Sequence, residues 1–210
     1  MNKLLTIIVV FVALGTGALV YQTSINLAQP EHSLYYKEPR VIKPFQFEDH
    51  HGEIFNNENL ANKWSVVFFG YTSCPDVCPT TLQELNFAYD ELKIASKDVQ
   101  ILLVSVDPVR DTTKKLAQYI SYFNNEFIAL RAGHSVLFPF ARNMGLMYSI
   151  TDGSKGEGYL VDHSASIVLI NPEGKIAAIF KPEHELGELP IISGDYLVSD
   201  LTKIVNLYNN

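Results

Sequence analysis

The chain contains very little cysteine, and the two residues that it has, Cys74 and Cys78, stand four positions apart. This scarcity excludes a scaffold held together by disulfides, because a cross-link over so short a loop removes little entropy from the unfolded chain. Apolar residues make up 47% of the 210 residues, which is enough for an ordinary hydrophobic core. The two thiols therefore point to metal or redox chemistry rather than to a structural role.

Clusters of basic residues are also absent from the sequence. The chain has 23 acidic and 16 basic residues, and its formal net charge is -7. Because binding to a phosphate backbone depends on gathered lysine and arginine, this composition argues against nucleic acid as a partner. The length suits one domain with a short appendage.

Charged residues are missing from residues 4–20, and Lys3 precedes this apolar run. The run is long enough for a thin or untilted membrane span, and it acts as an export signal in either case. No cleavage site of small residues and no cysteine for a lipid anchor follow Val20. We therefore favour an uncleaved transmembrane anchor over residues 1–24, with the rest of the chain outside the cytosol, where thiols meet oxidants and copper.

A polar segment without periodicity separates this anchor from the domain. Residues 25–40 contain Pro30 and scattered charges, which are typical of a tether. The domain is expected over residues 41–210.

Strands and helices are predicted to alternate through the first half of the domain. Continuous apolar runs bounded by turn residues indicate strands buried on both faces, and each is followed by apolar residues at helical spacing. This order predicts parallel strands, with Asp111 as the cap of the second helix. The expected strands are residues 64–69, 99–106 and 127–130, and the expected helices begin near Pro79, Asp111 and Ser135.

The flanking segments predict antiparallel strands. Residues 45–55 indicate a hairpin around Gly52, and residues 163–180 indicate a second hairpin with its turn at residues 171–174. A Gly-rich stretch over residues 151–158 is expected to be mobile, and the last helix is expected over residues 195–208. The fold class is therefore α/β, with a mixed sheet flanked by helices and an N-terminal hairpin.

The cysteines lie between the first buried strand and the first helix of the domain. The partial positive charge at the start of a helix favours thiolate over thiol, and Cys78 could cap the helix. Pro75 and Pro79 restrict the backbone of Cys74 and Cys78, which predicts a stiff, preformed loop. Two thiolates so placed can form a disulfide or hold a soft metal ion.

A third ligand must come from another segment, and His163 is the best candidate. It is expected at the start of a hairpin strand, after the Gly-rich stretch, although an ordinary strand-end histidine is an equal alternative on the pattern alone. Two thiolates and one imidazole suit copper in either oxidation state, and zinc less well. His50 and His51 fall in a predicted turn, where solvated side chains are typical.

Polar residues also mark the end of the second buried strand. Asp107 and Arg110 should open on the same rim as the cysteines, because the carboxyl ends of parallel strands meet at one edge of a sheet. They could contact a partner or serve only the turn and the helix cap.

Three motifs together resemble the Sco (SenC) family: GYTSCPDVCPTTL at residues 70–82, SVDPVRDT at residues 105–112 and VDHS at residues 161–164. The resemblance covers about residues 41–182. It implies a thioredoxin-like fold, usually behind one membrane anchor, and copper held by Cys74, Cys78 and His163.

The resemblance also implies a role in assembling the binuclear copper centre of cytochrome c oxidase, by delivering copper or by reducing the target's cysteines. The implied setting is the inner membrane of a respiratory bacterium, with the domain in the periplasm. The copper-centre subunit of the oxidase would then be the partner, and another copper chaperone could be the donor.

A metallochaperone is favoured over an enzyme, but redox alternatives use the same residues. In a periplasmic thiol-disulfide oxidoreductase, Cys74 and Cys78 would cycle between dithiol and disulfide, and His163 would tune the acidity of the sulfurs. A thiol peroxidase is a weaker variant of this alternative.

Overall fold

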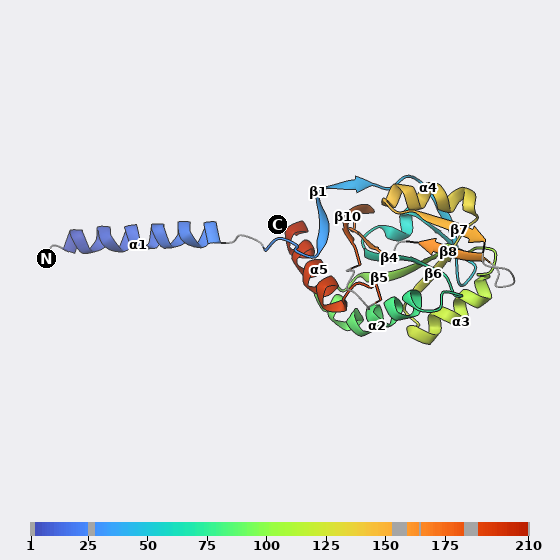
Figure 1. Cartoon of the computed structure of the whole chain (residues 1–210). Coiled ribbons are helices and arrows are strands. Elements are labelled where there is room, and N and C mark those ends of the chain that lie inside the picture. Colours follow the sequence, from blue (N-terminus) through green and yellow to red (C-terminus); the bar gives the residue numbers. More distant parts are fainter. Residues whose placement is uncertain (1–2, 25–27, 153–158, 164, 183–188, 210) are drawn as a thin grey trace.

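The structure is a computed structural model that describes residues 3–24, 28–152, 159–163, 165–182 and 189–209. Its main sheet has eight strands in the order β1-β10-β9-β4-β5-β6-β2-β3 (Figure 1). The centre of this sheet is parallel and contains β4 (Trp64–Gly70), β5 (Val99–Ser105) and β6 (Ile128–Arg131). Every residue of β4 and β5 is buried, as in a sheet covered on both faces. The predicted parallel strands are confirmed.

Antiparallel strands flank this parallel centre. On one side, β9 (Ile167–Ile170) pairs with β4, and β10 (Lys175–Phe180) pairs with β9. On the other side, β2 (Gln46–Asp49) pairs with β6 and with β3 (Ile54–Asn56). Gly52 allows the tight turn between β2 and β3, because its φ of 88° is one that other residues rarely adopt. The mixed sheet and the N-terminal hairpin are confirmed.

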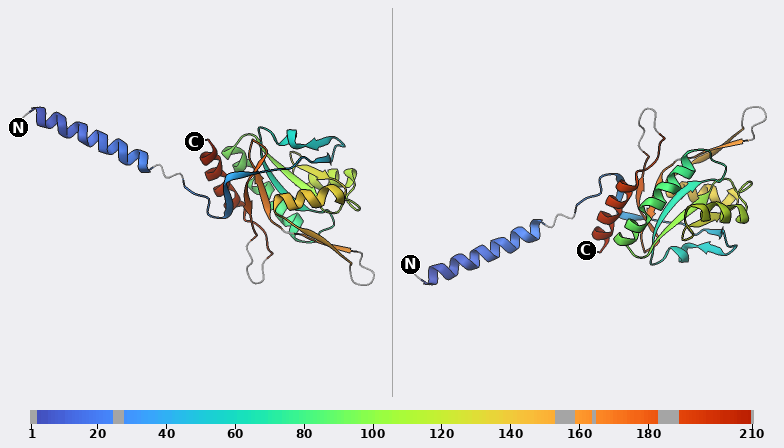
Figure 2. Two further views of the ribbon diagram at one scale, coloured as in Figure 1. Left: turned by 90° about the horizontal axis from the view of Figure 1, so that it is seen from above. Right: turned by 90° about the horizontal axis from the view of Figure 1, so that it is seen from below.

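Helices cover both faces of the sheet (Figures 1 and 2). One face carries α2 (Val77–Ala95), α3 (Thr113–Phe123) and α5 (Gly194–Tyr208), and the other carries α4 (His134–Met144). The helices α2 and α3 share a face because successive right-handed crossovers advance in the same direction across the sheet. A short 3-10 turn, η1 (Asn57–Leu60), lies between β3 and β4.

A second sheet of two strands was not predicted. It consists of β7 (Tyr148–Asp152) and β8 (Tyr159–His163), which pair antiparallel with Tyr148 opposite His163. His163 therefore ends β8 and does not begin the strand of the following hairpin, which corrects the expected position. Residues 153–158 of the Gly-rich stretch lie outside the described residues.

The tether predicted over residues 25–40 is too long. Residues Ser33–Val41 form β1, an edge strand that pairs antiparallel with β10. Charged residues and Pro39 remove the usual pattern of a strand from this segment. An edge strand tolerates them, because part of its backbone and side chains faces solvent.

A buried carboxylate fixes the start of β1 on α5. Asp200 accepts hydrogen bonds from the backbone N–H of Glu31 and His32, at 2.9 and 2.8 Å, and from the hydroxyl of Ser33 at 2.7 Å. The His32 ring stacks on Tyr196, with 3.8 Å between the ring centroids. The chain therefore packs against α5 from residue 31 onwards.

The amino-terminal segment forms α1 (Lys3–Ser24). Within the part of the chain that the structure describes, no helix combines the length and the apolarity needed to cross a membrane. The transmembrane helix predicted over residues 1–24 is therefore not supported.

Candidate metal centre

The two cysteines meet where β4 ends and α2 begins. Cys74 lies in the intervening loop and Cys78 is the second residue of α2. Neither cysteine forms a disulfide, and the backbone N–H of Cys78 donates to the Cys74 sulfur at 3.5 Å. The Cys74 side chain is partly exposed, whereas Cys78 is completely buried. The loop therefore presents one sulfur to the surface with the second one behind it.

The start of α2 differs from the expected cap. Asp76 is the N-cap residue, but its side chain makes no capping hydrogen bond, and the Cys74 sulfur accepts the N–H of Cys78 instead. Cys78 is helical, although proline follows it, and Pro79 is the third helical residue. The first turn tolerates proline because its N–H groups have no acceptor within the helix. The prediction that Cys78 caps the helix is wrong.

The Cys78 thiol also differs from the expected thiolate. Its hydrogen bond with Cys74 and then its burial raise the pKa of the Cys78 thiol. Both effects oppose the partial positive charge of the helix start, and in a buried apolar site they outweigh it. Its hydrogen bond and its burial therefore favour the thiol form of Cys78.

Gly70 provides the space for the Cys78 sulfur. A Cβ at this position would lie 3.1 Å from the Cys78 sulfur and 2.8 Å from Cε1 of Phe68. These separations are shorter than normal van der Waals contacts. The end of β4 must therefore be glycine for Cys78 to take its observed position.

Replacing Gly70 with alanine is expected to lower the free energy of unfolding by about 1–3 kcal/mol, because the extra methyl group overpacks the core. Denaturant unfolding of Gly70→Ala measures this loss. Gly133→Ala is the matched control, because its Cβ would meet no atom closer than 3.9 Å. Equal stability of the two variants would contradict the packing argument.

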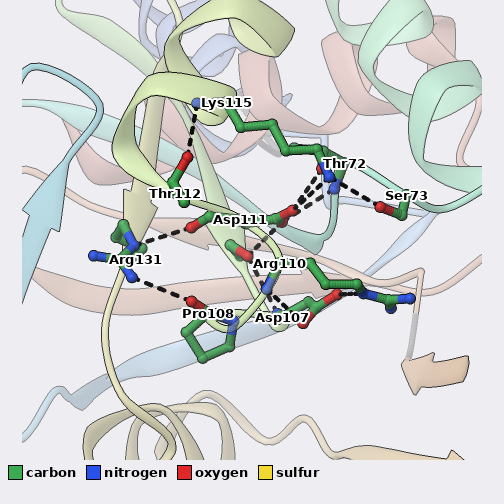
Figure 3. Close-up of polar contacts among 10 residues, drawn as sticks. Thr72, Ser73, Asp107, Pro108, Arg110, Asp111, Thr112, Lys115 and Arg131 are labelled. Carbon is green, nitrogen blue, oxygen red and sulfur yellow. Dashed lines mark hydrogen bonds and ion pairs between the residues drawn. The ribbon is translucent and has the colours of Figure 1, made fainter. Parts of the chain in front are cut away.

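The loop before the cysteines is braced by the buried carboxylate of Asp111, which lies in the segment between β5 and α3 (Figure 3). Asp111 accepts hydrogen bonds from the Thr72 N–H at 3.1 Å, the Thr72 hydroxyl at 2.5 Å and the Ser105 hydroxyl at 2.7 Å. It does not cap α3 as predicted. Thr112 does so instead, because its hydroxyl accepts the N–H of Lys115 at 3.2 Å.

The rim beside the cysteines carries charged residues of the segment after β5. Arg110 forms an ion pair with Asp107, and its guanidinium lies 5.6 Å from the centre of the Tyr71 ring. The Lys115 ammonium donates to the Ser73 hydroxyl at 3.1 Å (Figure 3). The prediction that Asp107 and Arg110 share a rim with the cysteine loop is confirmed.

The backbone of β8 reaches the same loop. Tyr71 is hydrogen-bonded to the backbone of Val161, two residues before His163. Its partner strand β7 is fixed to α4, because the hydroxyl of Tyr148, the first residue of β7, lies 2.8 Å from Nδ1 of His134. The predicted ligand side chain of His163 lies outside the described residues.

Another histidine has a structural role that the sequence did not indicate. His50 is 9% exposed, and its Nδ1 accepts the N–H of Ala129 at 3.1 Å. Burial lowers the pKa of His50, so the neutral ring that accepts this bond is favoured. The prediction of a solvated turn residue is wrong for His50.

The described residues supply two donors for a soft metal ion. Among them, no group of three or more histidine, cysteine, aspartate or glutamate side chains could hold a metal. Two neighbouring thiols at a fixed loop fit a soft ion, and a third ligand must come from elsewhere.

No sequence pattern predicted the residues that support this pair. These residues are Gly70, Thr72, Ser105 and the bracing carboxylate of Asp111. Their shared signal is their place at the ends of two adjacent parallel strands. Among the residues at this edge of the sheet, only Asp107 and Arg110 were predicted to lie beside the cysteines.

Known proteins resemble this chain in sequence and in fold. The sequence model of the SCO1/SenC family matches residues 35–190. A SCO2-like protein of Rickettsia prowazekii is 30% identical over 174 residues, which cover 80% of this chain and 85% of that protein.

Two solved structures have the same fold. Arabidopsis thaliana ScoI with copper bound has a TM-score of 0.71 and 31% identity, over 80% of this chain and 99% of that chain. Yeast Sco1 with copper bound has a TM-score of 0.68 and 27% identity, over 80% of this chain and 90% of that chain. Since the family match extends over most of the domain and includes both cysteines, the chain belongs to the SCO1/SenC family and has its thioredoxin-like fold.

Proposed function

We propose that this chain is a copper-binding assembly factor that holds copper with Cys74, Cys78 and His163. The observation that carries the proposal is the pair of neighbouring thiols in a braced loop, with the backbone nitrogen of Cys78 only 3.5 Å from the Cys74 sulfur. The copper-bound structures of Arabidopsis thaliana ScoI and yeast Sco1 support it.

The donor set fits copper as a cargo. Thiolates are soft ligands that favour copper(I), and an added imidazole also suits copper(II). Binding must release the proton of Cys78, whose pKa is raised by its hydrogen bond with Cys74 and by burial. Partial exposure of Cys74 leaves one side of the pair open to a donor or an acceptor of copper.

His163 is proposed as the third ligand because the β8 backbone lies against the cysteine loop through Tyr71 and Val161. Replacing His163 with alanine is expected to weaken copper binding by at least about 100-fold, since loss of an outer-shell partner alone costs 10- to 100-fold. Titration of the full reduced chain against a competing chelator measures the dissociation constant.

His51→Ala is the matched control for this titration, because it removes an exposed turn histidine. The sulfur-to-copper(II) absorption band should shift in His163→Ala and stay unchanged in the control. Unaltered affinity and spectrum in His163→Ala would show that the three-ligand site is wrong.

We further propose that the recipient is the copper-centre subunit of cytochrome c oxidase, with another copper chaperone as the donor. The resemblance of the three motifs to the Sco family supports this assignment. A periplasmic location is proposed from the same resemblance, and the apolar amino-terminal run predicts only that the domain lies outside the cytosol. Mixing the copper-loaded chain with the reduced soluble domain of that subunit should transfer copper, and no transfer would count against this target.

A thiol-disulfide oxidoreductase is the second candidate, and the two adjacent thiols favour it. In this reaction, Cys74 and Cys78 would form a disulfide and pass two electrons and two protons to a disulfide of the target. The dithiol form should then reduce such a substrate without copper. If the dithiol reduced neither this substrate nor the oxidised copper-centre subunit, the oxidoreductase would be excluded. Failure to reduce hydrogen peroxide would exclude the thiol peroxidase variant.

A further inference from the structure

We propose that Asp111 is a positioning residue that holds the cysteine loop in the arrangement that binds copper. The proposal rests on the copper-binding function inferred above. It assigns to Asp111 no direct contact with the metal and no proton transfer, only the placement of Cys74 relative to Cys78.

The carboxylate of Asp111 forms hydrogen bonds at the ends of two neighbouring strands. It is completely buried and accepts three hydrogen bonds, two from Thr72 after β4 and one from Ser105 at the end of β5. Because β4 and β5 are neighbouring parallel strands, these bonds fix the cysteine loop to the centre of the sheet.

The chain between Thr72 and Cys78 is short, so a displacement of Thr72 reaches both sulfurs. The Cys74 N–H donates to the carbonyl of Tyr71 at 3.2 Å, which closes a tight turn around Thr72. The Cys74 sulfur in turn accepts the N–H of Cys78. By fixing Thr72, the hydrogen bonds of Asp111 therefore fix the distance between the Cys74 and Cys78 sulfurs, because only one turn of chain lies between.

Asp111 is itself fixed by its backbone, which makes it a rigid brace (Figure 3). Its N–H donates to the carbonyl of Asp107 at 2.9 Å, and its carbonyl accepts Nε of Arg131 at 3.0 Å. Arg131 also donates to the carbonyl of Pro108 at 3.1 Å and to the carboxylate of Glu48 at 2.9 Å. A ligand loop held by such fixed partners is preorganised for its metal.

The chain offers a matched control in Asp200. This carboxylate is also completely buried and also accepts three hydrogen bonds, two from backbone N–H groups and one from a hydroxyl. Its partners are Glu31, His32 and Ser33, which are not part of the cysteine loop. Removing either carboxylate takes the acceptor from three hydrogen-bond donors, so both losses should reduce stability.

The experiment compares Asp111→Ala, Asp111→Asn and Asp200→Ala in the full chain. Two quantities are measured: the dissociation constant for copper, and the equilibrium constant between the Cys74–Cys78 disulfide and glutathione without metal. Asp111→Ala should raise the dissociation constant about tenfold or more. The dissociation constant of Asp111→Asn should lie between those of Asp111→Ala and the parent chain, because the amide oxygen can still accept hydrogen bonds from Thr72 and Ser105. Asp200→Ala should leave copper binding unchanged.

The metal-free measurement has its own expected result. The structure shows the hydrogen bonds of Asp111 while both thiols are reduced, so these bonds stabilise the dithiol form. Their loss in Asp111→Ala should favour the disulfide about tenfold, which lowers the reduction potential of the Cys74–Cys78 pair by about 30 mV. Asp200→Ala should not change this equilibrium. If the parent chain bound no copper, the proposed function would fail, while this redox comparison would still decide the role of Asp111.

Thr72→Val serves as a second variant if Asp111→Ala does not fold. It removes the hydroxyl that donates to Asp111 at 2.5 Å and keeps the size of the side chain. Copper affinity should fall about threefold, in line with the loss of one hydrogen bond. Copper affinity and redox equilibrium that match the parent in all the Asp111 and Thr72 variants would overturn the positioning role.

Discussion

Replacing Cys74 or Cys78 with serine is expected to abolish the sulfur-to-copper(II) absorption band of the full chain. A serine hydroxyl stays protonated at neutral pH and is a poor ligand for a soft ion, so each change removes one of the two sulfur donors. The loss should be severe for Cys78→Ser, because the completely buried sulfur would be replaced by a hydroxyl that is a poor ligand for a soft ion.

Copper titration and absorption spectra of the two serine variants test this expectation. Ser73→Ala is the control beside Cys74, since its hydroxyl contacts Lys115 rather than a sulfur. It should bind copper with the same band as the parent chain. A serine variant that kept the band and the affinity of the parent would exclude a two-thiolate site.

Replacing Asp200 with alanine is expected to lower the free energy of unfolding by about 3 kcal/mol. The change removes the acceptor of three hydrogen bonds from residues 31–33 and leaves Lys203, whose ammonium lies 3.7 Å away, without this carboxylate. Hydrogen bonds to a charged group contribute about 1.5–3 kcal/mol each, and the partial exposure of residues 31–33 keeps the total at or below the lower end of the summed range. The loss is a large share of the stability of an ordinary domain.

Denaturant unfolding of Asp200→Ala measures this loss, and Asp90→Ala is its control. Asp90 is exposed on α2, so its removal should change the stability by no more than about 0.5 kcal/mol. A decrease below about 1 kcal/mol in Asp200→Ala would show that residues 31–33 are not held by this carboxylate.

The centre of the fold could be predicted from the sequence because its signals are local. The buried strands β4 and β5 are continuous apolar runs, and the final hairpin has a turn with Gly174 at a positive φ of 71°. The motif around Cys74 and Cys78 located the candidate site at the end of β4.

The edges of the fold gave no comparable signal. The strand β1 contains charged residues and Pro39, and its order depends on pairing with β10, which lies more than a hundred residues away. The strands β7 and β8 are short and flank a Gly-rich stretch. Such edge strands lack the regular alternation that identifies a strand from sequence alone.

The environment of the thiols could not be predicted for a different reason. The pKa of Cys78 depends on its hydrogen bond with Cys74 and on burial, which only the packed structure reveals. The brace by Asp111 joins segments almost 40 residues apart through side-chain contacts. The sequence placed Asp111 at a helix start, where a capping role was the simpler interpretation.

The central proposal is that copper is held by two thiolates and one imidazole of this chain. X-ray absorption of the copper-loaded full chain counts these donors directly. The proposal predicts two sulfur ligands and one histidine nitrogen around each copper ion, with the nitrogen lost in His163→Ala. Fewer than two sulfur ligands, or a histidine nitrogen that remains in that variant, would contradict it.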